Sequence, residues 1–172
     1  MKLPAPGSDQ LILKKATTDD VARAMIDVIN ASSSDEITIF SAYLLLDESP
    51  IMTVENFCNF VFKSAYFQPD LPTAQTIRTL RRLISDGAAN CVDYSTALAS
   101  MALAVNLPVT LALVQFPGAS GFGHVFPIIA GTIADVVPGQ KQDGSERRTR
   151  PPGARPIIGT TAPYEAIKIY QV

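Results

Sequence analysis

Hydrophobic residues in the first half of the chain recur every three or four positions, which is the spacing of amphipathic helices. The Thr-Thr-Asp-Asp segment at 17–20 supplies a hydroxyl cap and acidic side chains for the start of a first helix. The apolar run at 37–46 is compatible with either a helix or a strand, and we favour a helix. The pattern predicts four helices, with a loop at 66–72 before the last one, over residues 17–31, 37–46, 53–65 and 76–85.

The second half of the chain opens with a long apolar stretch that begins at Cys91. The small and apolar residues from there to Asn106 suit a buried helix, which Pro108 ends. β-Branched and apolar residues then predict strands over 109–116, 124–129 and 132–137, and a C-terminal edge strand near 167–172. These elements together predict an α+β fold, in which N-terminal helices and the helix opened by Cys91 pack on a small antiparallel sheet.

No Asp, Glu, Lys or Arg occurs from Tyr94 to Ala134, and a window of about 19 residues in this stretch would satisfy a hydropathy criterion for a transmembrane helix. Asn106 and Pro108 would break such a helix in its middle, and no Lys or Arg flanks it. A buried helix followed by a buried strand explains the same residues. We therefore favour a chain without a membrane partner.

The composition bears on the number of domains, on nucleic-acid binding, on disulfides and on location. A chain of 172 residues with 47% hydrophobic residues can form one domain with a substantial core. A formal net charge of −2 gives no reason to expect nucleic acid as a partner. Cys58 and Cys91 are too few for a disulfide framework, and the pair could be bonded or free. Residues 1–10 lack the pattern of a secretory signal, so we expect a cytoplasmic location.

Proline, glycine and charged residues indicate where the domain begins and ends. Residues 1–15 are predicted to form a flexible N-terminal arm and residues 16–139 the folded domain. Residues 140–172 are predicted to contain an exposed loop, over 140–156, and the edge strand.

Three residues of the second half lie where a thiol nucleophile and its base are needed. Cys91 begins the predicted buried helix, where the helix dipole favours a thiolate and the backbone N–H can hold an oxyanion. His124, the only histidine, begins one predicted strand, and Asp135 lies on the next one, across Gly131. If these strands pair as a hairpin, Asp135 can orient the imidazole that acts on Cys91. The pattern favours a Cys-His-Asp site.

Each of these residues also has a structural interpretation. A cysteine in an apolar helix is usually inert, which is the interpretation that we adopt for Cys58 and leave open for Cys91. A single histidine often has a structural role, and Asp135 could stabilise a turn. Asp93, in the first turn of the helix, either caps it and offsets its dipole or orients the site. Asn90 is a further candidate for hydrogen bonding near an oxyanion.

Six segments of the chain carry a resemblance to a known family: Ala-Thr-Thr-Asp-Asp-Val at 16–21, Tyr-Phe-Gln-Pro-Asp at 66–70, Asn-Cys-Val-Asp-Tyr-Ser-Thr-Ala-Leu at 90–98, Asn-Leu-Pro-Val at 106–109, Gly-Phe-Gly-His-Val-Phe at 121–126 and Ala-Asp-Val at 134–136. They resemble the transglutaminase-like superfamily, specifically its small bacterial and phage members described as cysteine proteases. The resemblance implies a papain-like core in which Cys91 opens a core helix and His124 and Asp135 lie on successive adjacent strands. It implies a protein or peptide substrate and no metal or cofactor.

The activity implied by this resemblance is acyl transfer through a thioester. Water as the acceptor gives a peptidase or amidase and an amine gives a transglutaminase; the small prokaryotic members favour hydrolysis. The family usually has Gly-Asp where this chain has Ala89-Asn90, and it commonly has a tryptophan after the histidine, which this chain lacks. These departures support a second hypothesis, an inactive structural or binding module, associated with the virion if the protein is phage-encoded. The oligomeric state is not indicated.

Overall fold

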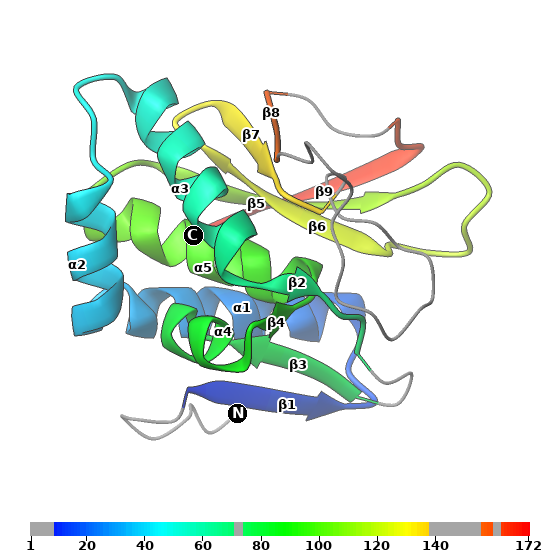
Figure 1. Cartoon of the computed structure of the whole chain (residues 1–172). Coiled ribbons are helices and arrows are strands. Elements are labelled where there is room, and N and C mark those ends of the chain that lie inside the picture. Colours follow the sequence, from blue (N-terminus) through cyan, green and yellow to red (C-terminus); the bar gives the residue numbers. More distant parts are fainter. Residues whose placement is uncertain (1–8, 71–73, 138–155, 160–162) are drawn as a thin grey trace.

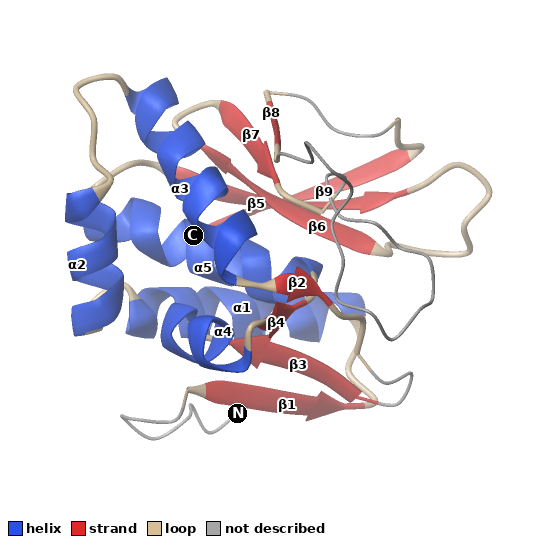
Figure 2. Ribbon diagram, in the orientation of Figure 1, coloured by secondary structure: helices blue, strands red, loops and turns tan. Residues whose placement is uncertain are grey.

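The computed structural model describes residues 9–70, 74–137, 156–159 and 163–172, and it has an α+β fold. A layer of helices packs against a five-stranded sheet, as Figures 1 and 2 show. The elements follow one another as β1 (Gln10–Lys14), α1 (Thr18–Ser32), α2 (Glu36–Leu44), α3 (Pro50–Ser64), β2 (Tyr66–Phe67), β3 (Ala74–Arg78), α4 (Leu80–Asp86), β4 (Ala88–Ala89), α5 (Cys91–Ala104), β5 (Val109–Gln115), β6 (His124–Ile129), β7 (Thr132–Asp135), β8 (Ile157–Ile158) and β9 (Ala166–Gln171).

Helix α5 is the centre of the fold, and it contacts α1, α2, α3 and α4 on one side and β5, β6 and β7 on the other. Its residues from Val92 to Ala102 are all buried. Alanine, serine and threonine side chains let the neighbouring elements approach closely, so a helix with no polar face is stable here. The chain leaves α5 at Asn106, which has a left-handed φ of 59°, and Pro108 follows. The predicted buried helix is thus confirmed.

The main sheet has the strand order β8-β7-β6-β5-β9, and all of its neighbouring strands are antiparallel. Strand β9 lies at one edge, which confirms the predicted C-terminal edge strand. Strands β6 and β7 are joined by the two residues Ala130 and Gly131, with φ of 48° and 80°. Two successive positive φ values are typical of a type I′ hairpin turn, whose twist matches that of the strands. The hairpin on which the predicted site depends is therefore present.

The four helices expected in the first half are only partly confirmed. Helices α1 and α2 match the predictions within about two residues, within the usual uncertainty of helix ends. Helix α3 begins at Pro50, not at Thr53, because Ser49 accepts a hydrogen bond from the backbone of Met52 and proline is favoured in a first turn. The loop predicted at 66–72 includes the short strand β2, which pairs in parallel with β4.

Two predictions failed together in part: residues 76–78 of the predicted helix over 76–85 belong to a strand, and so do residues 10–14 of the predicted flexible arm over 1–15. Residues 74–78 form strand β3, and only the following residues form helix α4, which Thr79 caps. Strand β3 pairs with β1, which is formed by residues 10–14 of the supposed arm. The pairing joins segments about sixty residues apart, which local periodicity cannot reveal. Residues 1–8 and 138–155, which include nearly all of the predicted exposed loop, lie outside the described residues.

The long uncharged stretch divides between α5 and strands β5 and β6. Within the described ranges, no helix combines the length and the apolar character that a membrane-spanning helix needs.

Candidate active site

Cys91 is the first residue of α5, and the residue before it holds the helix terminus in place. The Asn90 side chain accepts a hydrogen bond from the backbone N–H of Asp93, and the Asp93 carboxylate accepts one from the backbone N–H of Asn90, both at 3.0 Å. This reciprocal capping box fixes the backbone on both sides of the cysteine. The Cys91 side chain is a partly exposed free thiol, at the positive end of the helix dipole.

His124 lies at the start of β6 and is held from three sides. Its Nε2 is 2.7 Å from Oδ2 of Asp135, and its ring stacks on Phe116 with 5.7 Å between the ring centroids and contacts Phe126 at 5.9 Å. The other oxygen of Asp135 accepts a hydrogen bond from the backbone N–H of Val137 at 3.1 Å. Both partners are buried, His124 with 8% and Asp135 with 1% of their surface exposed, so the imidazole has a defined orientation.

Cys91 is the second residue that acts electrostatically on His124, and the two side chains line the same groove. Because Nε2 of His124 faces Asp135, Nδ1 is the ring nitrogen left for a further partner. Burial by itself lowers the pKa of His124, but the hydrogen bonds to Asp135 and Cys91 and the negative charges on them outweigh burial and raise that pKa to about 9. At this pKa the imidazole is protonated at neutral pH. The structure thus pairs His124 with Asp135 and places His124 and Cys91 in the lining of one groove.

Cys91 and His124 line the same groove, which has a volume of about 840 Å³. Its walls come from the end of β1, from α1, from β3 and from strands β5 and β6. The lining is mainly apolar, with two lysines and an aspartate: Leu13, Lys14, Lys15, Ala16, Thr18, Val21, Met25, Asp70, Ala74, Gln75, Cys91, Val92, Leu113, Phe122, Gly123, His124 and Val125. The groove gives an extended molecule access to the thiol.

The first turn of α5 leaves backbone donors free beside the thiol. In this turn the N–H of Asp93 bonds to Asn90 and the N–H of Tyr94 bonds to the carbonyl of Asn90. The N–H groups of Cys91 and Val92 have no intrahelical acceptor, because they belong to the first two helical positions. The buried Nδ2 of Asn90 also has no hydrogen-bond partner among the described residues. The backbone N–H groups of Cys91 and Val92 are therefore the candidate donors to an oxyanion formed next to Cys91.

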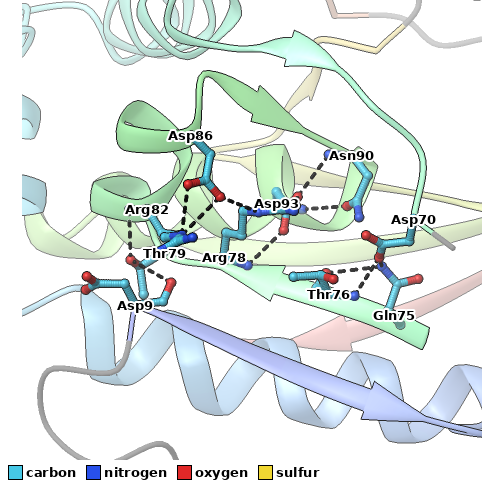
Figure 3. Close-up of polar contacts among 10 residues, drawn as sticks. All are labelled: Asp9, Asp70, Gln75, Thr76, Arg78, Thr79, Arg82, Asp86, Asn90 and Asp93. Atoms are coloured by element: carbon cyan, nitrogen blue, oxygen red, sulfur yellow. Dashed lines mark hydrogen bonds and ion pairs between the residues drawn. The ribbon is translucent and has the colours of Figure 1, made fainter. Parts of the chain in front are cut away.

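An ion pair between Arg78 and the buried Asp93 was not foreseen from the sequence (Figure 3). Asp93 is fully buried and accepts hydrogen bonds from Nη1 of Arg78, at 2.6 Å, and from the Arg78 backbone N–H, at 2.8 Å. Burial raises the pKa of Asp93 to about 6, against the opposing effects of the Asn90 hydrogen bond and the Arg78 charge. Arg78 also pairs with Asp86 at 3.1 Å. Through Arg78, Asp93 therefore links β3 and α4 to the turn that carries Cys91. Asp93 caps the helix, as one interpretation proposed, and it also holds that turn in place.

Asp70 and Gln75 are groove residues that the sequence did not single out. One oxygen of Asp70 accepts hydrogen bonds from the Gln75 side chain, at 2.6 Å, and from the backbone N–H of Thr76 (Figure 3). The Tyr-Phe-Gln-Pro-Asp segment was a possible signal, but nothing local in it indicates that its aspartate reaches the groove. The contacts of Asp70 depend on the placement of β3, which was wrongly predicted as a helix.

Cys58 is a structural residue, as the sequence suggested. It is fully buried in α3, and burial, with the nearby charges of Asp135 and Glu55, raises the pKa of its thiol to about 12. Both cysteines are free, which settles the alternative of a disulfide between them. Cys58 cannot compete with Cys91 as a nucleophile, because a thiol of such a pKa is almost never ionised at neutral pH.

Among the described residues, no group of three His, Cys, Asp or Glu side chains is placed to hold a metal ion. No family model, no curated protein and no solved structure matches this chain. The resemblance to transglutaminase-like proteins therefore stays a prediction.

Proposed function

We propose that this protein is a cysteine-dependent acyl-transfer enzyme that hydrolyses amide or peptide bonds, with a transglutaminase-like, papain-like core. The observation that carries the proposal is the 2.7 Å pair between the buried Asp135 and His124, together with the groove that His124 and the Cys91 thiol line side by side. A structural histidine needs neither a thiol at a helix N-terminus nor an open groove beside it. The placement of the thiol on a central helix, against an antiparallel hairpin that carries the other two residues, supports the proposed family.

The reaction begins with an ion pair, in which the proton of Cys91 is already on the imidazole of His124. The thiolate attacks the carbonyl carbon of the substrate, forming a C–S bond. The N–H groups of Cys91 and Val92 donate hydrogen bonds to the oxyanion. His124 then returns its proton to the leaving nitrogen as the C–N bond breaks, which leaves a thioester on Cys91 and releases an amine.

The second half of the reaction regenerates the enzyme. His124 takes a proton from water, and the resulting hydroxide forms a C–O bond with the thioester carbonyl. The C–S bond breaks, the carboxylic acid product leaves, and the thiolate and imidazolium are restored. Asp135 stays ionised and hydrogen-bonded to Nε2 throughout, which fixes the ring so that Nδ1 faces the sulfur. A primary amine in place of water would give transamidation by the same steps.

The groove supports a peptide as the substrate. Its apolar lining, which includes Val21, Leu113 and Phe122, suits a hydrophobic side chain near the reacting carbonyl, and the backbone of an extended peptide fits an open groove better than a closed pocket.

The test compares two cysteine variants. Cys91→Ala should abolish hydrolysis of a fluorogenic peptide library and abolish labelling by iodoacetamide, mapped by mass spectrometry, whereas Cys58→Ala should keep both. Circular dichroism and the unfolding midpoint check that each variant is folded. Hydrolysis that persists in Cys91→Ala would overturn the proposal. A wild-type Cys91 that is labelled no faster than a free peptide thiol, without hydrolysis, would support the inactive module instead.

A further inference from the structure

Exposed hydrophobic side chains are concentrated in one segment on the side of the molecule away from the groove. Of the twelve large hydrophobic residues that are exposed in the described part of the chain, seven lie between residues 39 and 52: Ile39, Phe40, Tyr43, Leu44, Leu46, Ile51 and Met52. We call this set the α2 surface. Isolated exposed hydrophobic residues are normal in proteins, but seven in one short segment indicate an interaction site.

Hydrogen bonds tie the end of α2 and the loop after it to the first turns of α3. The Asn56 side chain donates a hydrogen bond to the carbonyl of Leu45 at 3.1 Å, and Thr53 exchanges hydrogen bonds with the backbone of Asp47. Helix α2 turns Thr38, Ser41 and Ala42 towards the protein, where they are buried against α5 and its neighbours. Its opposite side is left uncovered by the described residues.

The α2 surface has both a projection and a hollow. Phe40 and Leu44 are exposed by 66% and 69%, which is unusual for side chains of this size. They border a hollow of about 600 Å³ that is also lined by Glu36, Ile39 and Tyr43. A surface that pairs with its own copy about a two-fold axis must hold both complementary features, since the same residues are contributed by each subunit.

We propose that the α2 surface binds a second copy of this chain and forms a two-fold symmetric dimer. Seven side chains between 38% and 69% exposed present roughly 700 Å² of accessible surface, close to the value of about 800 Å² that each subunit contributes to a standard interface. The exposed area in this segment is thus of the size that a dimer needs.

Helix α2 sets how the two subunits are arranged in the proposed dimer. Two α2 helices pack antiparallel across the axis, and Phe40, the fifth of nine residues, lies next to its own counterpart. The formal net charge of −2 produces little repulsion between copies.

The dimer leaves both active-site grooves open. In Figure 1, α2 forms the left edge of the molecule, whereas the loop between β5 and β6, which leads into His124, forms the right edge. The proposal is therefore independent of the proposed hydrolysis, and either can fail without the other.

Sedimentation velocity of the wild-type protein, from micromolar to submillimolar concentration, tests the dimer directly. The mass should rise from 18.4 kDa to twice that value with concentration. Phe40→Lys and Leu44→Lys should lose the dimer, because a charge would be buried in the interface. At a concentration where the wild type is monomeric, each should unfold at the wild-type midpoint, since both side chains are exposed. Ile169→Lys, an exposed isoleucine on β9, is the matched control and should dimerise as the wild type does.

A second measurement tests the orientation. Phe40→Cys, in a Cys91→Ala background, should form an intersubunit disulfide under mild oxidation, whereas Ile169→Cys in the same background should not. A wild-type protein that stays monomeric at every concentration, or a dimer that Phe40→Lys leaves intact, overturns the proposal. A monomer whose α2 surface binds a different protein also overturns it, because the second copy is then not the occupant.

Discussion

Replacing Asp135 by Asn tests whether the charge of this buried carboxylate controls the protonation of His124. The two side chains have nearly the same shape, and the amide oxygen can still accept a hydrogen bond from Nε2. The substitution therefore removes the negative charge that faces the imidazole at 2.7 Å and leaves the packing close to that of the wild type.

The size of the effect follows from the pKa of His124, which is raised from 6.5 to about 9. A group whose pKa is higher in the folded state stabilises that state while it is protonated, so the stabilisation is complete below about pH 6.5 and is lost as the pH rises through about 9. At about 1.4 kcal/mol per pKa unit, the wild-type free energy of unfolding should fall by about 3 kcal/mol across this interval. In Asp135→Asn most of that dependence should disappear.

The assay is urea unfolding at a series of pH values between 6 and 10, followed by circular dichroism, for the wild type, Asp135→Asn and His124→Gln. The His124→Gln variant has no imidazole and supplies the background dependence from all other groups. If Asp135→Asn has the same slope of unfolding free energy against pH as the wild type, Asp135 does not hold the proton on His124, and the reasoning fails.

Three further predictions concern the groups around the site. For peptide hydrolysis, kcat/KM should fall as the pH rises through about 9, where the imidazolium loses the proton that it gives to the leaving group; a rate that keeps rising above this pH contradicts the proposed acid. Arg78→Met should lower the free energy of unfolding, measured by urea titration, by about 3–5 kcal/mol, because it leaves the Asp93 carboxylate buried without its charged partner. Arg81→Met, at an exposed ion pair, is the control and should lower it by at most about 1 kcal/mol. Gly131→Ala should lower the free energy of unfolding by about 1–2 kcal/mol in thermal unfolding, because an alanine is strained at a φ of 80°. Gly121→Ala should lower it much less, because an added Cβ there also meets no atom and no positive φ is required. Equal losses of stability would refute a conformational cause.

The parts of the fold that were predicted correctly are those whose signals are local. Helix α5 follows from an apolar run that opens after a polar cap and ends before Pro108, and β6 follows from a run of apolar residues after a glycine-rich turn. The proximity of His124 and Asp135 also needed only a tight turn between adjacent strands. The three candidate residues could be selected because their positions at the ends of elements are visible in the sequence.

The parts that were missed depend on contacts between distant segments. Strand β3 was taken for a helix because its partner, β1, lies about sixty residues earlier in a segment that was predicted to be flexible. Arg78 lies on that strand, so its ion pair with Asp93 was equally hidden. No local pattern distinguishes an arginine on a solvated helix from one that is directed at a buried carboxylate.

The sequence by itself determined the elements that carry the candidate site, because capping residues, turn residues and hydrophobic periods act over a few neighbouring positions. Only the tertiary structure decided that Cys91 and His124 line the same groove, since α5 and β6 are brought together by the packing of the whole core. It also decided the charge of that imidazole, because burial and the approach of a carboxylate, which together set its pKa, exist only in the folded chain.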